Sequence, residues 1–146
     1  KKLGTAGGLS LLKDKITTDF ILMNSDILTC LNFETFLDYH SKNNADLTIC
    51  AKETILQQKY GVLEINENKL KALIEKPVYK NFINAGIYAL NPNLLSLIKK
   101  NTKLDIPNLI NDLIKMNKKI ITYYLNDYWL DIGHLDDYEK AKNEWK

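Results

Sequence analysis

The chain has 146 residues, and its 20 basic and 18 acidic side chains leave a formal net charge of +2. With 45% apolar and 26% charged residues, it has the composition of a globular protein that builds a core without disulfide or metal staples. The charge balance argues against a nucleic-acid binder, and no apolar run approaches the roughly 20 residues of a membrane span.

Short apolar runs alternate with stretches of helical periodicity. Strands are predicted over residues 20–23, 47–50, 83–90 and 120–125. Helices are predicted after Asn32 and after Asp105, which are both placed as N-caps, and from about Leu135 to Trp145. The strand–helix–strand order over residues 20–50 predicts a right-handed parallel crossover.

Residues 60–76 break this alternation, since they contain two strand-like runs joined by Asn66-Glu67-Asn68. This pattern predicts an antiparallel hairpin, and therefore a mixed sheet. No repeat or flexible linker interrupts the chain, which predicts one domain. Cys30 and Cys50 lie in apolar stretches without zinc-type spacing, which favours reduced, buried thiols in a cytoplasmic protein.

The segment Leu3-Gly4-Thr5-Ala6-Gly7-Gly8 places three glycines just before an apolar run. Such a turn can present backbone N–H groups to an anion or a flat base. It matches neither the Walker loop nor the dinucleotide fingerprint, and a purely structural tight turn is the other interpretation.

Two apolar runs each lead to one carboxylate. Asp26 follows Phe20–Met23 at a strand end, where ligands of open α/β sheets gather, and Asp131 follows Trp129 and Leu130. Two such acids in one cleft could hold Mg²⁺ through hard oxygen ligands. The alternatives are that Asp26 caps a short turn and that Asp131 caps the last helix.

Further polar residues lie between these acids. Glu75 and Lys76 end a strand before Pro77, where they could meet sugar hydroxyls and a phosphate or form a solvated ion pair. Asn84 lies inside an apolar run, so its amide needs a partner, either the backbone or a ligand.

These pieces, in this order, resemble the sugar nucleotidylyltransferases, or nucleoside-diphosphate-sugar pyrophosphorylases. The resemblance runs from Leu3 to Trp145 and is greatest to the mannose-1-phosphate guanylyltransferase and glucose-1-phosphate thymidylyltransferase branch. It rests on six short motifs in the family's order: Leu3-Gly4-Thr5-Ala6-Gly7, Met23-Asn24-Ser25-Asp26, Tyr60-Gly61-Val62, Ile74-Glu75-Lys76-Pro77, Asn84-Ala85-Gly86-Ile87-Tyr88 and Trp129-Leu130-Asp131-Ile132-Gly133.

The resemblance implies an α/β fold with a mixed, mostly parallel nucleotide-binding sheet and flanking helices. It implies a Mg²⁺-assisted reaction of a nucleoside triphosphate with a sugar-1-phosphate that gives an NDP-sugar and pyrophosphate, with GTP weakly favoured. The site residues that it implies are Asp26, Asp131 and Lys76 for catalysis, with the two acids on the metal; Gly4, Thr5 and Gly7 for the nucleotide; and Gly61, Glu75 and Asn84 for the sugar.

The sequence departs from the family pattern in two places. Ser25 stands where the family has a glycine, and nothing in the chain corresponds to the family's N-terminal glycine-rich loop, whose Arg and Lys cradle the triphosphate. The chain is therefore expected to be the C-terminal portion of a single nucleotidyltransferase domain, with little activity alone and with an exposed strand edge that favours homo-oligomers.

Three other functions remain open. A non-catalytic sugar-nucleotide-binding remnant would retain the pocket without the triphosphate clamp. A metal-dependent glycosyltransferase usually needs an Asp-x-Asp motif, of which Asn24-Ser25-Asp26 supplies one acid. A phospho-receiver domain would use Asp26 and Lys76-Pro77, but it requires regular βα alternation.

Overall fold

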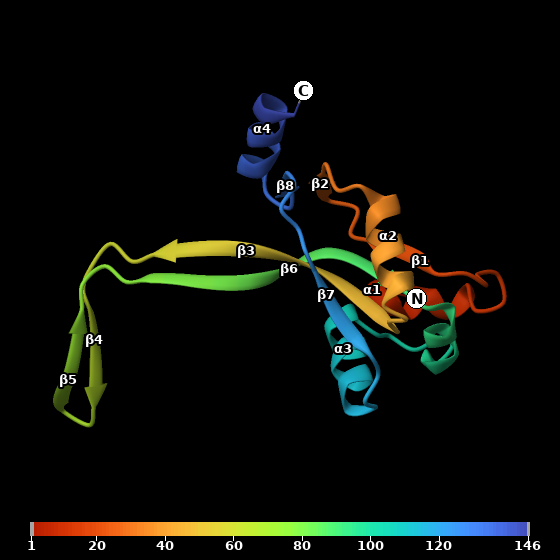
Figure 1. Ribbon diagram of the computed structural model, residues 1–146, viewed down its shortest axis with the longest axis horizontal. Helices are drawn as coiled ribbons and strands as arrows, with labels where there is room; N and C mark the ends of the chain where they lie inside the picture. Colours follow the sequence, from red (N-terminus) through yellow and green to blue (C-terminus); the bar gives the residue numbers. More distant parts are fainter. Residues whose placement is uncertain (1, 146) are drawn as a thin grey trace.

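A four-stranded mixed sheet forms the centre of the fold, as a computed structural model that describes residues 2–145 shows (Figure 1). Its strand order is β1-β6-β3-β7. These strands span Phe20–Met23 (β1), Leu47–Gln57 (β3), Val78–Leu90 (β6) and Ile120–Tyr124 (β7). Strand β6 runs antiparallel to both of its neighbours, whereas β3 and β7 are parallel. The predicted mixed sheet is confirmed, and β1, β3 and β7 share one direction.

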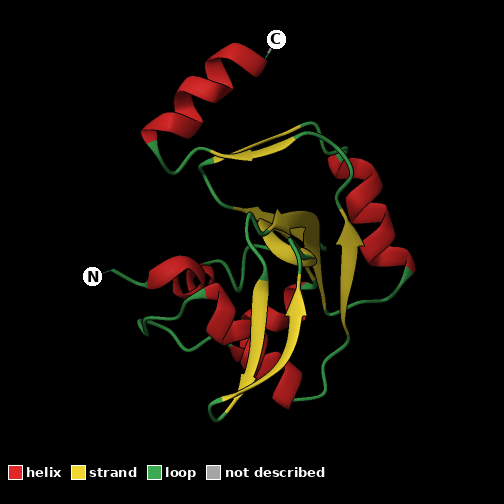
Figure 2. Cartoon of the chain, turned by 90° about the vertical axis from the view of Figure 1, so that its left-hand side faces the viewer, coloured by secondary structure: helices red, strands yellow, loops and turns green. Residues whose placement is uncertain are grey.

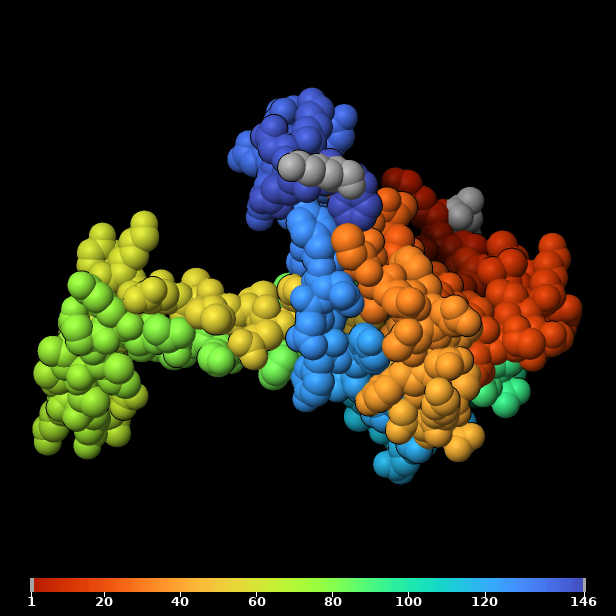
Figure 3. Space-filling view, turned by 45° about the horizontal axis from the view of Figure 1, so that its top comes forward, coloured from red at the N-terminus to blue at the C-terminus, as the bar shows by residue number. Residues whose placement is uncertain are grey.

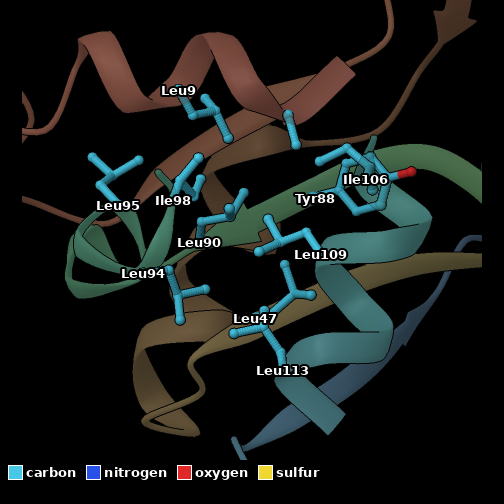
Figure 4. Packing of buried hydrophobic residues seen from close by; sticks show 11 residues of the cluster. Leu9, Leu47, Tyr88, Leu90, Leu94, Leu95, Ile98, Ile106, Leu109 and Leu113 are labelled. Carbon is cyan, nitrogen blue, oxygen red and sulfur yellow. The ribbon is translucent and has the colours of Figure 1, made fainter. Parts of the chain in front are cut away.

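Helices cover both faces of this sheet. One face packs against α1 (Gly4–Gly7), η1 (Gly8–Leu11), η2 (Pro92–Leu97) and α3 (Ile106–Lys115). In this layer Leu47 and Leu90 from the sheet contact Leu109 and its neighbours, as Figure 4 shows. The opposite face packs against Phe36 of α2 (Phe33–Lys42). Alternation along β6 explains both layers, because successive side chains of a strand point to opposite faces.

The helix starts follow the predicted N-caps in position, but only one cap acts as expected. Asn32 accepts a hydrogen bond of 2.9 Å from the backbone N–H of Thr35 and caps α2. Helix α3 begins directly after Asp105, yet the Asp105 side chain makes no capping bond to its own helix. Its carboxylate instead accepts from the backbone N–H of Thr5, about a hundred residues away in the chain.

Strands β3 and β6 continue well beyond the sheet as a two-stranded arm (Figure 1). The predicted hairpin, with β4 (Val62–Asn66) and β5 (Lys69–Ile74) antiparallel, is confirmed and sits at the end of this arm. In the space-filling view the arm stands clear of the main body (Figure 3). Both of its faces are open, so several apolar side chains, including Ile55 and Phe82, are exposed. The expected self-association stays a prediction.

A second small sheet lies on the other side of the core. It consists of β2 (Ile27–Thr29) and β8 (Trp129–Asp131), which pair antiparallel. Helix α4 (Leu135–Glu144) follows β8 and stands beyond this pair, away from the four-stranded sheet (Figure 2). The Trp129 indole N–H donates to the carbonyl of Ala85 at 2.8 Å and so fixes the small sheet to β6.

The two cysteines differ in burial. Cys50 is fully buried, as expected, but Cys30 is exposed and the expectation of a buried thiol there is wrong. Cys30 comes directly after the three-residue strand β2 and lines an open surface hollow with Tyr128, Glu144 and Trp145. No helix within residues 2–145 has both the length and the apolar content needed to cross a membrane.

Candidate functional site

A hollow of about 350 Å³ lies at the C-terminal end of β1. Its wall combines residues from three parts of the chain: Thr5, Leu22, Met23, Asn24, Ser25, Asp26 and Ile106. Ligands of open α/β sheets bind at the carboxyl ends of strands, because the loops there diverge and leave a crevice. The hollow brings Thr5, which the sequence predicts as a nucleotide contact, to the same wall as Asp26, which it predicts as a metal ligand.

A close contact between β1 and β6 sets the position of Asp26. The backbone N–H of Asn24 donates to the carbonyl of Gly86 at 2.9 Å, at the end of the β1–β6 ladder. Gly86 has φ +71°, and a Cβ there would lie 2.8 Å from the Asn24 side-chain nitrogen. A side chain at this position would be strained by the positive φ and would have to displace the Asn24 side chain. The chain then turns through Ser25, and the exposed Asp26 carboxylate makes no hydrogen bond or ion pair with any residue in 2–145.

Asp131 lies on β8, beside the Asp26 segment, although it is not among the residues that line the hollow. Ile27 lies opposite Asp131 in the β2–β8 register, and the backbone N–H of Ile132 donates to the carbonyl of Asp26 at 2.8 Å. The Asp131 Oδ1 accepts a hydrogen bond of 2.9 Å from the backbone N–H of Gly133. Asp131 does not cap the last helix, because His134 occupies the N-cap of α4. The two acids therefore lie on neighbouring segments.

The donor set here suits a hard cation that is only partly held by protein. Asp26 offers a free carboxylate and Asp131 a second oxygen, Oδ2, beside the one that Gly133 engages. In the described part of the chain, no three or more His, Cys, Asp or Glu side chains are grouped so that they could hold a metal ion. Mg²⁺ usually keeps several waters and binds through one or two carboxylates plus substrate phosphates. The residues fit that ion better than a fully protein-ligated metal.

The glycine-rich segment differs from expectation in what its N–H groups do. The N–H groups of Ala6 and Gly7 donate to the carbonyl of Leu104 at 2.9 and 3.0 Å, and that of Thr5 donates to Asp105. These three N–H groups are therefore bonded within the protein, and the expectation that they are presented to a bound anion is wrong. What the segment offers the hollow is the Thr5 side chain.

Asn84 finds its partners inside β6. Its Oδ1 accepts from the backbone N–H of Gly86 at 3.0 Å, and its Nδ2 donates to the Tyr88 hydroxyl at 2.7 Å. Burial raises the pKa of Tyr88, so this hydroxyl stays neutral. Of the two alternatives left open by the sequence, the structure shows the protein-bonded one.

Gly61 directly precedes β4, and Glu75 and Lys76 directly follow β5, so all three lie at the base of the hairpin and are not among the residues that line the hollow. A Cβ on Gly61 would lie 2.9 Å from Glu75 Oε2, so these two residues are in contact. Glu75 and Lys76 are both exposed and form no ion pair with each other or with another residue in 2–145. The solvated ion pair is thus not formed.

Two contacts of this site have no signal in the sequence. Ile106 lines the hollow because Thr5 meets the start of α3, and Trp129 anchors β8 through the Ala85 carbonyl. Each contact joins residues far apart in the chain. No local spacing rule could have found them.

Comparison with known proteins gives consistent results. The family model described as "Nucleotidyl transferase" matches residues 1–146. The mannose-1-phosphate guanyltransferase of Yarrowia lipolytica is 35% identical over 144 residues, which cover 93% of this chain and 39% of that protein. A probable mannose-1-phosphate guanylyltransferase 3 of Arabidopsis thaliana is 34% identical, with 93% and 43% coverage. The chain thus spans about two fifths of the length of these curated relatives.

Solved structures show the same fold. HddC from Yersinia pseudotuberculosis, in a complex with GMP-PN, superposes with a TM-score of 0.70 at 26% identity, covering 100% of this chain and 64% of that one. A glucose-1-phosphate thymidylyltransferase described as putative, from Bacillus anthracis, superposes with a TM-score of 0.71 at 18% identity, covering 98% and 61%.

Proposed function

Because the chain belongs to the nucleotidyl transferase family, we propose that it serves the transfer of a nucleoside monophosphate from an NTP to a sugar-1-phosphate. A phosphate oxygen of the sugar-1-phosphate attacks the α-phosphorus, and the bond to the β-phosphate breaks and releases pyrophosphate. The names of the matched relatives favour GTP and mannose 1-phosphate as the pair. The observation that carries the proposal is the placement of Asp26 beside the Asp131 segment, at the hollow that Thr5 lines.

Asp26 and Asp131 are the residues that would hold Mg²⁺. When bound, this ion would neutralise the two phosphate groups that must approach each other and would stabilise charge on the α-phosphate. Two carboxylates from neighbouring segments can share one ion. The turn at Ser25 sets the backbone position of Asp26, and the hydrogen bond from the Gly133 N–H orients the Asp131 carboxylate.

Thr5, with Gly4 and Gly7 around it, would contact the nucleotide. The two glycines pack against the segment that leads into α3. A Cβ added to Gly4 would lie 2.4 Å from Asp105 Oδ1, and a Cβ added to Gly7 would lie 2.5 Å from the Thr102 carbonyl oxygen. Their contribution is close packing that sets the wall of the hollow, and the Thr5 side chain supplies the polar contact.

Glu75 and Lys76 would bind the sugar-1-phosphate, with Gly61 beside them and Asn84 nearer the sheet. Both charged side chains are exposed and unpaired within residues 2–145, so a ligand would not have to break an ion pair. The outer half of the arm contributes no residue to either buried cluster of the described chain.

The test combines two measurements. First, the chain itself is titrated with Mg·GTP. Second, the chain joined to the N-terminal glycine-rich loop of a curated relative is assayed for pyrophosphate release with a panel of triphosphates and sugar-1-phosphates. We expect release to be fastest with GTP and mannose 1-phosphate, and Asp26→Asn to abolish most of it. Asp38→Asn, an exposed acid of α2 paired with Lys42, is the matched control.

Three results would oppose the proposal. No pyrophosphate from any substrate pair would rule out the transferase reaction, and nucleotide binding without release would favour a sugar-nucleotide-binding protein. Equal turnover of the Asp26→Asn and Asp38→Asn variants would remove Asp26 from the site.

A further inference from the structure

The start of α3 and the short helix α1 cap each other. The backbone N–H of Thr5 donates to Asp105 Oδ1 at 3.1 Å, and the backbone N–H of Ile106 donates to Thr5 Oγ1 at 2.9 Å. Each side chain thus accepts from the other element's first N–H groups, which have no partner within their own helix. We call this pair of bonds between Thr5 and residues 105–106 the Thr5–Asp105 clasp.

Backbone bonds surround the clasp and leave it little freedom. The N–H groups of Ala6 and Gly7 donate to the Leu104 carbonyl, while the N–H of Leu104 donates to the carbonyl of Leu3 at 2.9 Å. Gly4 has φ +74° and is pressed against residues 104 and 105. A side chain at Gly4 would therefore clash with the clasp itself.

The clasp determines what the Thr5 hydroxyl can do. A hydroxyl has one proton to donate and two lone pairs to accept with. The N–H of Ile106 occupies a lone pair of Thr5 Oγ1, so the proton is available for another acceptor. The hydroxyl donates to no residue in 2–145, and Thr5 and Ile106 both line the hollow beside Asp26, so a ligand there can supply the acceptor.

Asp105 has no other evident task. It stands at the N-cap position of α3 without capping that helix, whose second residue, Pro107, has no N–H to donate. Its Oδ1 instead accepts from the backbone N–H of Thr5, and this bond fixes the orientation of the Thr5 backbone.

We propose that Asp105 is a positioning residue for nucleotide binding: it holds Thr5 so that the Thr5 hydroxyl donates to an oxygen of the bound nucleotide. The inference rests on the proposed function, because it needs a nucleotide in the hollow. The geometry requires an acceptor at Asp105 and a hydroxyl at Thr5. It does not require a negative charge at Asp105.

The experiment measures Mg·GTP binding by calorimetry for the purified protein and its variants. Asp105→Ala is expected to weaken binding about tenfold, whereas Asp105→Asn, which keeps an acceptor oxygen, stays within about twofold. Thr5→Val weakens binding to a similar degree, and Thr5→Ser retains it. Asp112→Ala is the matched control, because Asp112 is an exposed acid on the same helix paired only with Lys115.

A double-variant cycle separates positioning from general damage. If Asp105 acts through the Thr5 hydroxyl, Asp105→Ala adds little further loss of binding once Thr5 is Val. Hydrogen exchange at the Thr5 amide should also become faster in Asp105→Ala and not in Asp112→Ala. A purely structural role would lower the melting temperature and lower binding by the same factor in both Thr5 backgrounds.

Each other outcome is decisive. Unchanged binding in Asp105→Ala, or an undiminished loss in the Thr5→Val background, overturns the inference and leaves the proposed function standing. If Asp105→Ala does not fold, the Thr5→Val and Thr5→Ser pair carries the test, and equal binding by both overturns it. Failure of the unaltered protein to bind Mg·GTP overturns the proposed nucleotide site, and the inference with it.

Discussion

The backbone N–H of Ile132 donates to the carbonyl of Asp26 at 2.8 Å, and this bond places the segment that carries Asp131 alongside the end of β1. If the two acids share one Mg²⁺, Asp26→Asn and Asp131→Asn should each lower Mg²⁺-dependent turnover by about 100-fold or more, because a bound cation contributes several kcal/mol. Steady-state assays at a series of Mg²⁺ concentrations measure this turnover, with the chain joined to the N-terminal glycine-rich loop of a curated relative.

The double variant provides the control for shared action. Two ligands of one ion act as a unit, so the double variant should lose little more than either single variant. If the losses of the two single variants multiply fully in the double variant, or if Asp38→Asn loses as much turnover as they do, a shared ion is contradicted.

Trp129→Phe tests the anchor of the small sheet. The substitution removes the indole N–H that donates to the carbonyl of the fully buried Ala85. Leaving that carbonyl without a partner should lower the free energy of unfolding by about 1–3 kcal/mol. Urea denaturation measures the loss. Trp145→Phe is the control, because Trp145 is 45% exposed and its variant should stay within about 0.5 kcal/mol; equal losses would contradict the role of the anchor.

The two thiols should react at very different rates. Cys50 is fully buried, and burial raises its pKa to about 12, whereas Cys30 is exposed. Because the thiolate is the reactive form, a disulfide reagent at about pH 8 should label one thiol in the native protein and both after denaturation. Cys30→Ser should remove the fast phase. Two fast thiols in the native protein would show that Cys50 is accessible.

His40 should make stability depend on pH below neutrality. Its side chain is fully buried, with Nδ1 2.7 Å from Thr48 Oγ1, and Nε2 has no hydrogen-bond partner among residues 2–145. Desolvation lowers the pKa of His40 below 6.5 and outweighs the opposing effects of Asp19 and Asp46. The unfolded chain therefore takes up the proton first, so the free energy of unfolding should fall as the pH drops from 6.5 toward the folded-state pKa.

Urea denaturation at a series of pH values measures this slope. His40→Gln should be less stable overall but should lose the slope that His40 contributes. His134→Gln, which alters the exposed second histidine, should keep the slope of the unaltered protein. Parallel curves for His40→Gln and the unaltered protein would assign the pH dependence to other groups.

Local signals predicted much of the fold. The run of apolar residues over 20–23 gave β1, the spacing after Asn32 gave α2 with its cap, and Asn66-Glu67-Asn68 gave the hairpin. These features depend on residues a few positions apart. The lengths of β3 and β6 were underestimated, because charged residues such as Glu53 end an apolar run. In the arm, where both faces meet solvent, Glu53 pairs with Lys80 at 3.3 Å instead.

The sequence by itself determined which residues are candidates for the chemistry, because local order is enough to identify carboxylates after apolar strands and glycines before a helix. Only the tertiary structure decided which of them meet. The pairing of β2 with β8 brings the segments of Asp26 and Asp131 together, and the Thr5–Asp105 clasp turns the glycine-rich N–H groups inward. Both depend on three-residue strands or single bonds across about a hundred residues. The packed core beside them stabilises the β2–β8 pairing and the clasp, and that core is assembled from residues far apart in the sequence.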